Sequence, residues 1–292
     1  MAVYERAYRA YSGPIAPEAA RRTVVTRYAL ADLFANKKFV GWFVACLGWP
    51  IGNALYLYAI NNLDILRPLG VSVGGALSSA VGTKFFLVFL QIQGLIFAFV
   101  TTLFVGPGLI SPDLRNNALP LYFSRPLTRT EYLTGKGTVL ALVLSLMTWV
   151  PGLLLWLFQA ILAGGSWWSA NLRPALAVFF GAWLLIVVLT LLALAISALV
   201  KWKPLAGAVI FAVYIGGKPF ALALNELLDT GWGNLLDINY LVETTWSWML
   251  GSATNPQIGS LPPWAALVAL GLVCAGCVAL LKRRVKAYEV VR

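Results

Sequence analysis

The sequence predicts an all-α integral membrane protein with six transmembrane helices. An amphipathic interfacial helix is expected before the first span, and short re-entrant outer helices between spans five and six. Of the 292 residues, 60% are hydrophobic and only 11% are charged, whereas a soluble domain carries about 25% charged residues. The apolar residues gather in six long runs, and Lys218 is the only charged residue inside any of them. Lys and Arg are distributed unevenly over the segments between these runs.

Each of the six runs reaches or approaches the length that a membrane span needs. About 20 residues of helix cross about 30 Å of hydrocarbon, and a helix is expected because lipid cannot satisfy a free backbone N–H or C=O. The predicted spans are residues 39–60, 85–110, 138–164, 175–200, 205–224 and 264–281. Together they form a six-span domain over residues 39–281.

The basic residues predict the orientation. Of 22 Lys and Arg, 18 lie in residues 1–38, 111–137, 201–204 and 282–292, and three lie in the alternate connections. Because cytoplasmic loops carry an excess of basic residues, we expect these four segments to be cytoplasmic, both termini and the basic tail 282–292 included. A multi-pass protein of a cell membrane, of the bacterial inner-membrane kind, is expected. The same bias explains the net charge of +11, so no nucleic-acid partner is expected.

The cytoplasmic N-terminal segment, residues 1–38, predicts the interfacial helix. Within residues 17–38, apolar side chains share one helical face and basic side chains surround it. Such a helix can lie in the headgroup layer against anionic lipid. Packing as a soluble helix on a partner is the alternative. The segment has no long apolar core, so no cleavable signal peptide is expected.

The polar segment of residues 111–137, between spans two and three, carries two helix-start signals. Ser111 provides a hydroxyl N-cap, and a proline and Asp113 follow in the first turn. Thr128 and Glu131 have the spacing of a capping box, from which a new helix continues into the third span. We expect capped helix starts at both ends of the segment.

Between these signals the pattern predicts one short helix across the cytoplasmic mouth of the bundle. Its apolar face consists of Leu114, Ala118, Leu121 and Tyr122. This spacing is typical of a helix with one buried face. Pro120 limits the length of the helix, because a helix interior tolerates no missing N–H.

The same segment resembles the first cytoplasmic loop of the permease subunits of type-2 ABC exporters. That loop runs from an acid through a small-Leu pair and a Pro-hydrophobic-Ser/Thr-Arg turn to a second acid and a closing Gly-Lys. The matching positions are Asp113, Ala118-Leu119, Pro126-Leu127-Thr128-Arg129, Glu131 and Gly135-Lys136. Asp113 stands where Glu is commoner, and Asn117 stands where Gly is usual. In architecture the resemblance covers the whole chain.

The resemblance implies a permease subunit that pairs with a second copy, as a homodimer or a heterodimer, and with two cytoplasmic ATPase subunits. These ATPases would hold ATP and Mg²⁺, and this chain would hold no cofactor or metal. The short helix of the loop would be the coupling helix, seated in a cleft of the ATPase. The residues expected to couple are Asp113, Leu114, Ala118, Leu119, Leu121, Tyr122, Arg125, Pro126, Arg129 and Glu131. Substrate stays open among lipid, hydrophobic drug, peptide, ion and polysaccharide, and export rests on the resemblance.

The chain itself is not expected to be an enzyme, and no catalytic residue is predicted. It has no histidine, and the stretch TGKGT at residues 134–138 has Thr130 where a phosphate loop needs Gly. Cys274 and Cys277 have redox spacing but lie within a span, which favours two small residues on a helix face. A non-transporting accessory subunit or a membrane-embedded enzyme is the alternative function.

Lys218 is a candidate for the substrate path or a gate. A base inside a span is costly and usually faces a cavity or a partner. We expect Pro219 to break the helix beside it. A structural ion pair with Glu226 or Asp229 is the other interpretation.

Polar and small residues in the first two spans leave two interpretations open. Gln91 and Gln93 either line the substrate path or bond to neighbouring helices. Gly48 and Gly52 form a GxxxG pattern, which either marks a close-packed helix face or is incidental.

The outer segment of residues 225–263 is too apolar for a free loop and too interrupted for a span. It holds no Lys or Arg, four acids and the three tryptophans Trp232, Trp246 and Trp248. We expect short helices that dip into the outer interface, with the indoles at headgroup level.

Overall fold

The computed structural model describes residues 18–62, 81–123, 128–251 and 261–285, and these residues form helices and connecting turns without strands. The helices are α1 (Glu18–Ala35), α2 (Lys37–Asn61), α4 (Thr83–Leu90), η3 (Gln91–Ala98), α5 (Phe99–Val105), η4 (Gly106–Gly108), α6 (Ser111–Arg115), α7 (Leu119–Phe123), α8 (Arg129–Met147), α9 (Trp149–Ala163), α10 (Gly165–Ala170), α11 (Leu172–Leu199), α12 (Lys203–Leu228), η5 (Trp232–Leu236), α13 (Ile238–Leu250) and α14 (Pro263–Arg284). Here η3 is a π-helix, while η4 and η5 are 3₁₀-helices.

Six of the helical stretches are long and apolar enough to cross a membrane, as the sequence predicts. Within the described residues they are Lys37–Asn61, Thr83–Arg115, Arg129–Ala163, Leu172–Leu199, Lys203–Leu228 and Pro263–Arg284. The protein is therefore an all-α, multi-pass membrane protein. Most of these stretches extend beyond the predicted runs because helix continues through polar residues at their ends.

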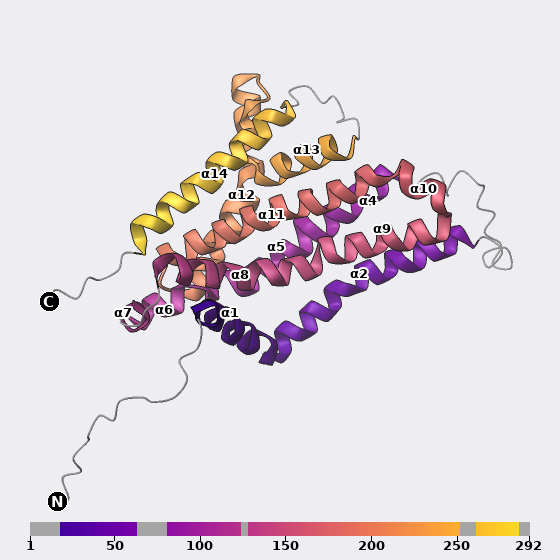
Figure 1. Ribbon diagram of the computed structural model, residues 1–292. Coiled ribbons are helices and arrows are strands. Elements are labelled where there is room, and N and C mark those ends of the chain that lie inside the picture. Colours follow the sequence, from indigo (N-terminus) through magenta and orange to yellow (C-terminus); the bar gives the residue numbers. More distant parts are fainter. Residues whose placement is uncertain (1–17, 63–80, 124–127, 252–260, 286–292) are drawn as a thin grey trace, which may run out of the picture.

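The helix α11 is the centre of the bundle. It packs against α8 and α9 on one side and against α12, α13 and α14 on others, and α4 and α5 also contact it (Figure 1). The start of α1, the helices α6 and α7, and the end of α14 all lie at one end of the bundle (Figure 1). We call this the basic end, because it carries Lys136, Lys201, Lys203 and Lys282.

The third span bends where α8 ends and α9 begins. Pro151 has no N–H to donate to the carbonyl of Met147, so the helical ladder cannot continue there. Thr148 takes φ −108° and ψ −84° at this junction. Pro50 in α2 likewise leaves the carbonyl of Cys46 without its helical donor, although α2 runs on through it. Buried carbonyl groups need a hydrogen-bond donor, so the Met147 and Cys46 carbonyls must accept from a group outside their own helices.

Two expectations for residues 205–263 are wrong. Pro219 does not break α12, which continues from Lys203 to Leu228. Trp246 is fully buried, and its Nε1 donates to the Gly181 carbonyl at 2.9 Å. An indole that packs against the bare backbone of Gly181 belongs to the core and not to a surface layer. Trp232 and Trp248 are exposed on either side of it in sequence.

Candidate functional site

The segment between the second and third spans forms two short helices, not the one helix that the sequence predicts. The helix α6 ends at Arg115, and α7 begins at Leu119. Asn117 between them has φ +49°, a left-handed conformation that suits Gly best and Asn next. The chain therefore turns at the position where the resembling loops usually have Gly. Both helices lie at the basic end of the bundle (Figure 1).

Two details of this segment differ from expectation. Ser111 is the first residue of α6, and its hydroxyl makes no cap; it donates to the Ser197 carbonyl in α11 at 3.0 Å. Pro120 does not limit a helix but lies in the first turn of α7. A missing N–H costs nothing there, because the first N–H groups of a helix have no intrahelical acceptor.

The two ends of the segment are joined by an ion pair. Lys136 Nζ lies 2.8 Å from Asp113 Oδ2, and both side chains are mostly buried, 13% and 15% exposed. The Tyr132 hydroxyl donates to the same carboxylate oxygen at 2.6 Å. The first acid and the closing lysine of the motif are thus in direct contact, and the tyrosine between them completes the cluster.

The segment is also anchored to two other helices. The Ser197 hydroxyl of α11 accepts from the backbone N–H groups of Ile110 and Ser111, each at 2.9 Å. Thr26 of α1 donates to the Gly135 carbonyl at 2.9 Å. A Cβ on Gly135 would lie 3.3 Å from Val25 Cβ, so glycine lets α1 pack closely on α8. A displacement of the segment would therefore reach α1, α8 and α11 together.

The capping box at the start of α8 is confirmed. The Thr128 hydroxyl accepts from the Glu131 N–H at 3.3 Å, and the Glu131 carboxylate accepts from the Thr128 N–H at 2.9 Å. Two backbone donors at the helix start are thereby satisfied. The third span begins at a fixed point.

The predicted coupling residues divide between the interior and the surface. Leu119 is buried, and Leu114 and Tyr122 pack partly against the core, so much of the predicted apolar face contacts this chain itself. The Ala118 N–H donates to the Asp113 carbonyl at 2.8 Å and closes the end of α6. Among the predicted coupling residues Arg129 is exposed, and its exposed neighbours in the segment include Arg115, Asn116, Asn117 and Pro120. Arg125, Pro126 and the side chain of Leu121 lie outside the described parts.

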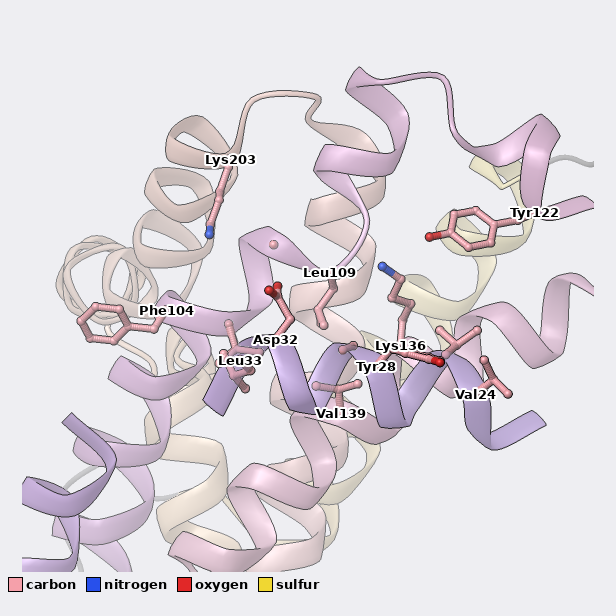
Figure 2. Close-up of a pocket in the computed structure, with 14 residues that line it drawn as sticks. Val24, Tyr28, Asp32, Leu33, Phe104, Leu109, Tyr122, Lys136, Val139 and Lys203 are labelled. Atoms are coloured by element: carbon pink, nitrogen blue, oxygen red, sulfur yellow. The ribbon is translucent and has the colours of Figure 1, made fainter. Parts of the chain in front are cut away.

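A cavity of about 460 Å³ lies beside this segment, between α1, α5, α8 and the start of α12. Figure 2 shows Lys203 and Asp32 turned toward the same space, with Lys136 and Tyr122 on its other side. Burial, and after it the charge of Asp113, raises the pKa of Tyr122. A tyrosine hydroxyl is protonated at neutral pH in any case, so that of Tyr122 can donate into the cavity.

Gln93 does not line a path. It is fully buried, and its Nε2 donates to the Met147 carbonyl at 2.8 Å and to the Cys46 carbonyl at 3.3 Å. These are the two carbonyls that Pro151 and Pro50 leave free. One amide group thus supplies both missing donors and ties the first three spans together.

Gln91 begins η3, and Lys218 lies on α12. Gln91 Nε2 donates to Glu243 of α13, so this side chain also bonds a neighbouring helix. Lys218 is exposed on α12, and it forms no ion pair with Glu226 or Asp229, both of which are described. The ion-pair interpretation of Lys218 is therefore wrong.

Sequence reasoning did not single out Tyr132, Thr26 and Ser197 at this site. Ser197 carried a signal, because it is a hydroxyl in an otherwise apolar stretch of α11. Within the described ranges no three His, Cys, Asp or Glu side chains gather as a metal site would need. A scan against protein-family models and a search of curated proteins both find no match. The resemblance to type-2 ABC exporter permeases stays a prediction.

Proposed function

We propose that this chain is the permease subunit of a type-2 ABC transporter, acting as an exporter with a second permease copy and two cytoplasmic ATPase subunits. The basic end is then cytoplasmic, α1 lies in the headgroup layer, and α13 with η5 forms the re-entrant outer element. ATP and Mg²⁺ are bound by the ATPases. This chain supplies the moving helices.

The observation that carries the proposal is the way the segment from Ser111 to Gly137 is attached to the rest of the bundle. The Asp113–Lys136 ion pair joins its ends, and Ser197 and Thr26 attach it to α11 and α1. A lever must be stiff to transmit a rigid-body shift to packed helices. A connecting loop has no need of a mostly buried ion pair and of hydrogen bonds to two other helices.

The exposed rim of the segment is the surface that would meet the ATPase. Since Leu119 is buried in this chain, docking would depend on Arg115, Asn117 and Arg129 more than on a full apolar face. Two arginines at this rim suit a partner cleft with acidic residues, and placing like charges across an interface costs several kcal/mol.

The test is co-purification of an ABC ATPase with the tagged chain from native membranes. The variant Arg115→Glu/Arg129→Glu should lose the ATPase while the protein yield stays normal, and Lys201→Glu, an exposed lysine at the same end, is the matched control. If no ATPase accompanies the unaltered chain, or if the double variant retains it fully, the proposal fails.

The orientation is tested separately. An impermeant thiol reagent applied to intact cells should label Asn234→Cys, in η5, and should leave Asn117→Cys silent until lysis. The three native cysteines are replaced by serine in both variants. Labelling of Asn117→Cys from outside would reverse the orientation and contradict the coupling role.

A further inference from the structure

A second cavity lies on the side of the bundle and has different chemistry. Its volume is about 590 Å³, and its walls are almost entirely apolar. The helices α8, α11 and α14 form it, with Trp149 of α9. Its lining includes Thr130, Thr134, Ala141, Ser145, Thr190 and Lys282. We call it the α8–α14 groove. It is separate from the cavity beside α1.

The groove runs along α8. On α8 it extends from Thr130 to Ser145, which is about 22 Å at 1.5 Å per residue. One leaflet contributes about 15 Å of hydrocarbon. The groove is therefore long enough for one leaflet and its polar edge. Trp149 and Trp183 line its deep part.

Among the described residues that line the groove, the one charged residue lies toward the basic end. Lys282 lies in the last turn of α14, and Thr130 and Thr134 lie in the first two turns of α8. A basic pocket at the polar edge of transmembrane helices is typical of binding sites for anionic lipid headgroups. Beyond Thr134 the lining of α8 continues with Gly137, Thr138, Ala141, Leu142 and Ser145.

Thr190 of α11 forms part of the groove wall, and its hydroxyl oxygen is buried within the chain. It is 8% exposed and lines the groove, and its hydroxyl finds no hydrogen-bond partner in the described part of the chain. Buried hydroxyls normally have one. Its methyl lies 3.4 Å from the place where a Cβ on Gly137 would stand. Gly137 is the last residue before the apolar run of α8, so Thr190 lies where the polar edge of the groove meets its apolar part.

From these contacts we infer that the α8–α14 groove binds one anionic phospholipid of the leaflet at the basic end. The Lys282 ammonium holds its phosphate, and Thr130 and Thr134 line the polar edge beside it. One acyl chain lies along α8, past Thr190, toward Trp149. The inference needs only that the chain lies in a bilayer, and it does not depend on the transport function.

The experiment uses the full chain in nanodiscs with phosphatidylglycerol that carries a diazirine in one acyl chain. After irradiation, adducts should concentrate on the α8 peptide that contains Ala141 and Ser145. Unlabelled phosphatidylglycerol should compete better than phosphatidylcholine. Labelling spread evenly over α2 and α8 without headgroup preference would mean ordinary boundary lipid, and protection of the groove by a second copy would mean a protein contact. Either result overturns the inference.

Two pairs of variants sharpen the test. Lys282→Gln should reduce the preference for phosphatidylglycerol about fivefold, the loss expected for one basic contact to an anionic headgroup. Arg283→Gln, its exposed neighbour outside the lining, should not. Ala141→Trp should fill the groove and abolish the adducts, whereas Leu272→Trp on the exposed face of α14 should leave them. If Lys282→Gln and Arg283→Gln have the same lipid preference, and Ala141→Trp and Leu272→Trp give the same amount of adduct, the proposed site is wrong.

Discussion

The central helix of this bundle and the helices at its periphery use the same residue types in different ways. Here "inner" means central in the bundle, as α11 is, and "outer" means peripheral, as α2 and α12 are. In the most apolar stretch of α11, 67% of the residues are buried within the chain, against 22% in α2 and in α12. All three stretches are apolar enough to span a membrane. Hydropathy thus identifies what enters the membrane but does not distinguish a helix that packs on protein from one that faces lipid or a second copy.

Glycine shows this difference most directly. A Cβ on Gly181 of α11 would lie 2.7 Å from the Trp246 ring, and one on Gly94 of η3 would lie 2.8 Å from it. A Cβ on Gly48 or Gly52 of α2 would meet nothing within 4 Å. The inner glycines accommodate an indole, while the outer glycines leave a flat, uncovered face. The comparison predicts at which positions a substitution will lower the free energy of unfolding of the single chain.

The largest effect is expected at Trp246, which the inner glycines enclose. Trp246→Ala should lower the free energy of unfolding by about 3–5 kcal/mol, the usual cost of removing a buried aromatic side chain. Trp248→Ala is the control, because Trp248 lies on the same helix and is 53% exposed. Thermal unfolding of both variants in detergent measures the difference. Equal losses would mean that the inner and outer positions do not differ as the structure indicates.

A smaller loss is expected at Gln93. Gln93→Leu leaves the Cys46 and Met147 carbonyls without donors, and each unsatisfied buried group costs about 1–3 kcal/mol. The same variant combined with Pro50→Ala and Pro151→Ala should recover stability, because alanine restores the two missing N–H donors. Thermal unfolding of the single and triple variants tests this. A triple variant no more stable than Gln93→Leu would show that the prolines are not the reason for the glutamine.

The sequence predicted the parts of this molecule that depend on local chemistry. Six apolar runs, the capping box at Thr128 and Glu131, and a helix start at Ser111 follow from short-range patterns, and the structure has all of them. The contact between Asp113 and Lys136 joins residues that are far apart along the segment. No spacing rule predicts such a pair, although both residues belong to the motif.

The predictions for Ser111, Gln93 and Trp246 were wrong or incomplete for one physical reason. The role of a polar or aromatic side chain depends on which groups of other helices lie next to it. Ser111 could cap its own helix, but Ser197 offers a buried partner. The sequence left two roles open for Gln93. Its acceptors are the Cys46 and Met147 carbonyls, which prolines in two other helices leave free. Trp246 looked like an interface residue because its sequence neighbours are polar, and only the bare backbone at Gly181 explains its burial.

The outer face of α2 should tolerate changes that the inner helices cannot. Gly48→Ile/Gly52→Ile should change the free energy of unfolding of the single chain by no more than about 0.5 kcal/mol, as at other surface positions. If this face packs against a second copy, the same variant should dissociate the dimer, because small residues let backbones approach closely. Gly271→Ile on α14, also open, is the control. Native mass spectrometry from nanodiscs reads the copy number, and an intact dimer would exclude this face as its interface.

Lys218 should give the smallest effect on stability and the clearest separation of stability from function. It is exposed on the outer helix α12, about 22 Å from the start of that helix at 1.5 Å per residue. A base at such depth is costly when lipid surrounds it, so Lys218→Leu should leave unfolding unchanged or slightly raise the midpoint. If the lysine faces a path between two copies, the variant should still assemble and should lose substrate-stimulated ATP hydrolysis. Lys218→Arg keeps the charge and should retain that stimulation. Reduced yield of Lys218→Leu would indicate a structural role, and normal yield with full stimulation would remove Lys218 from both the path and the gate.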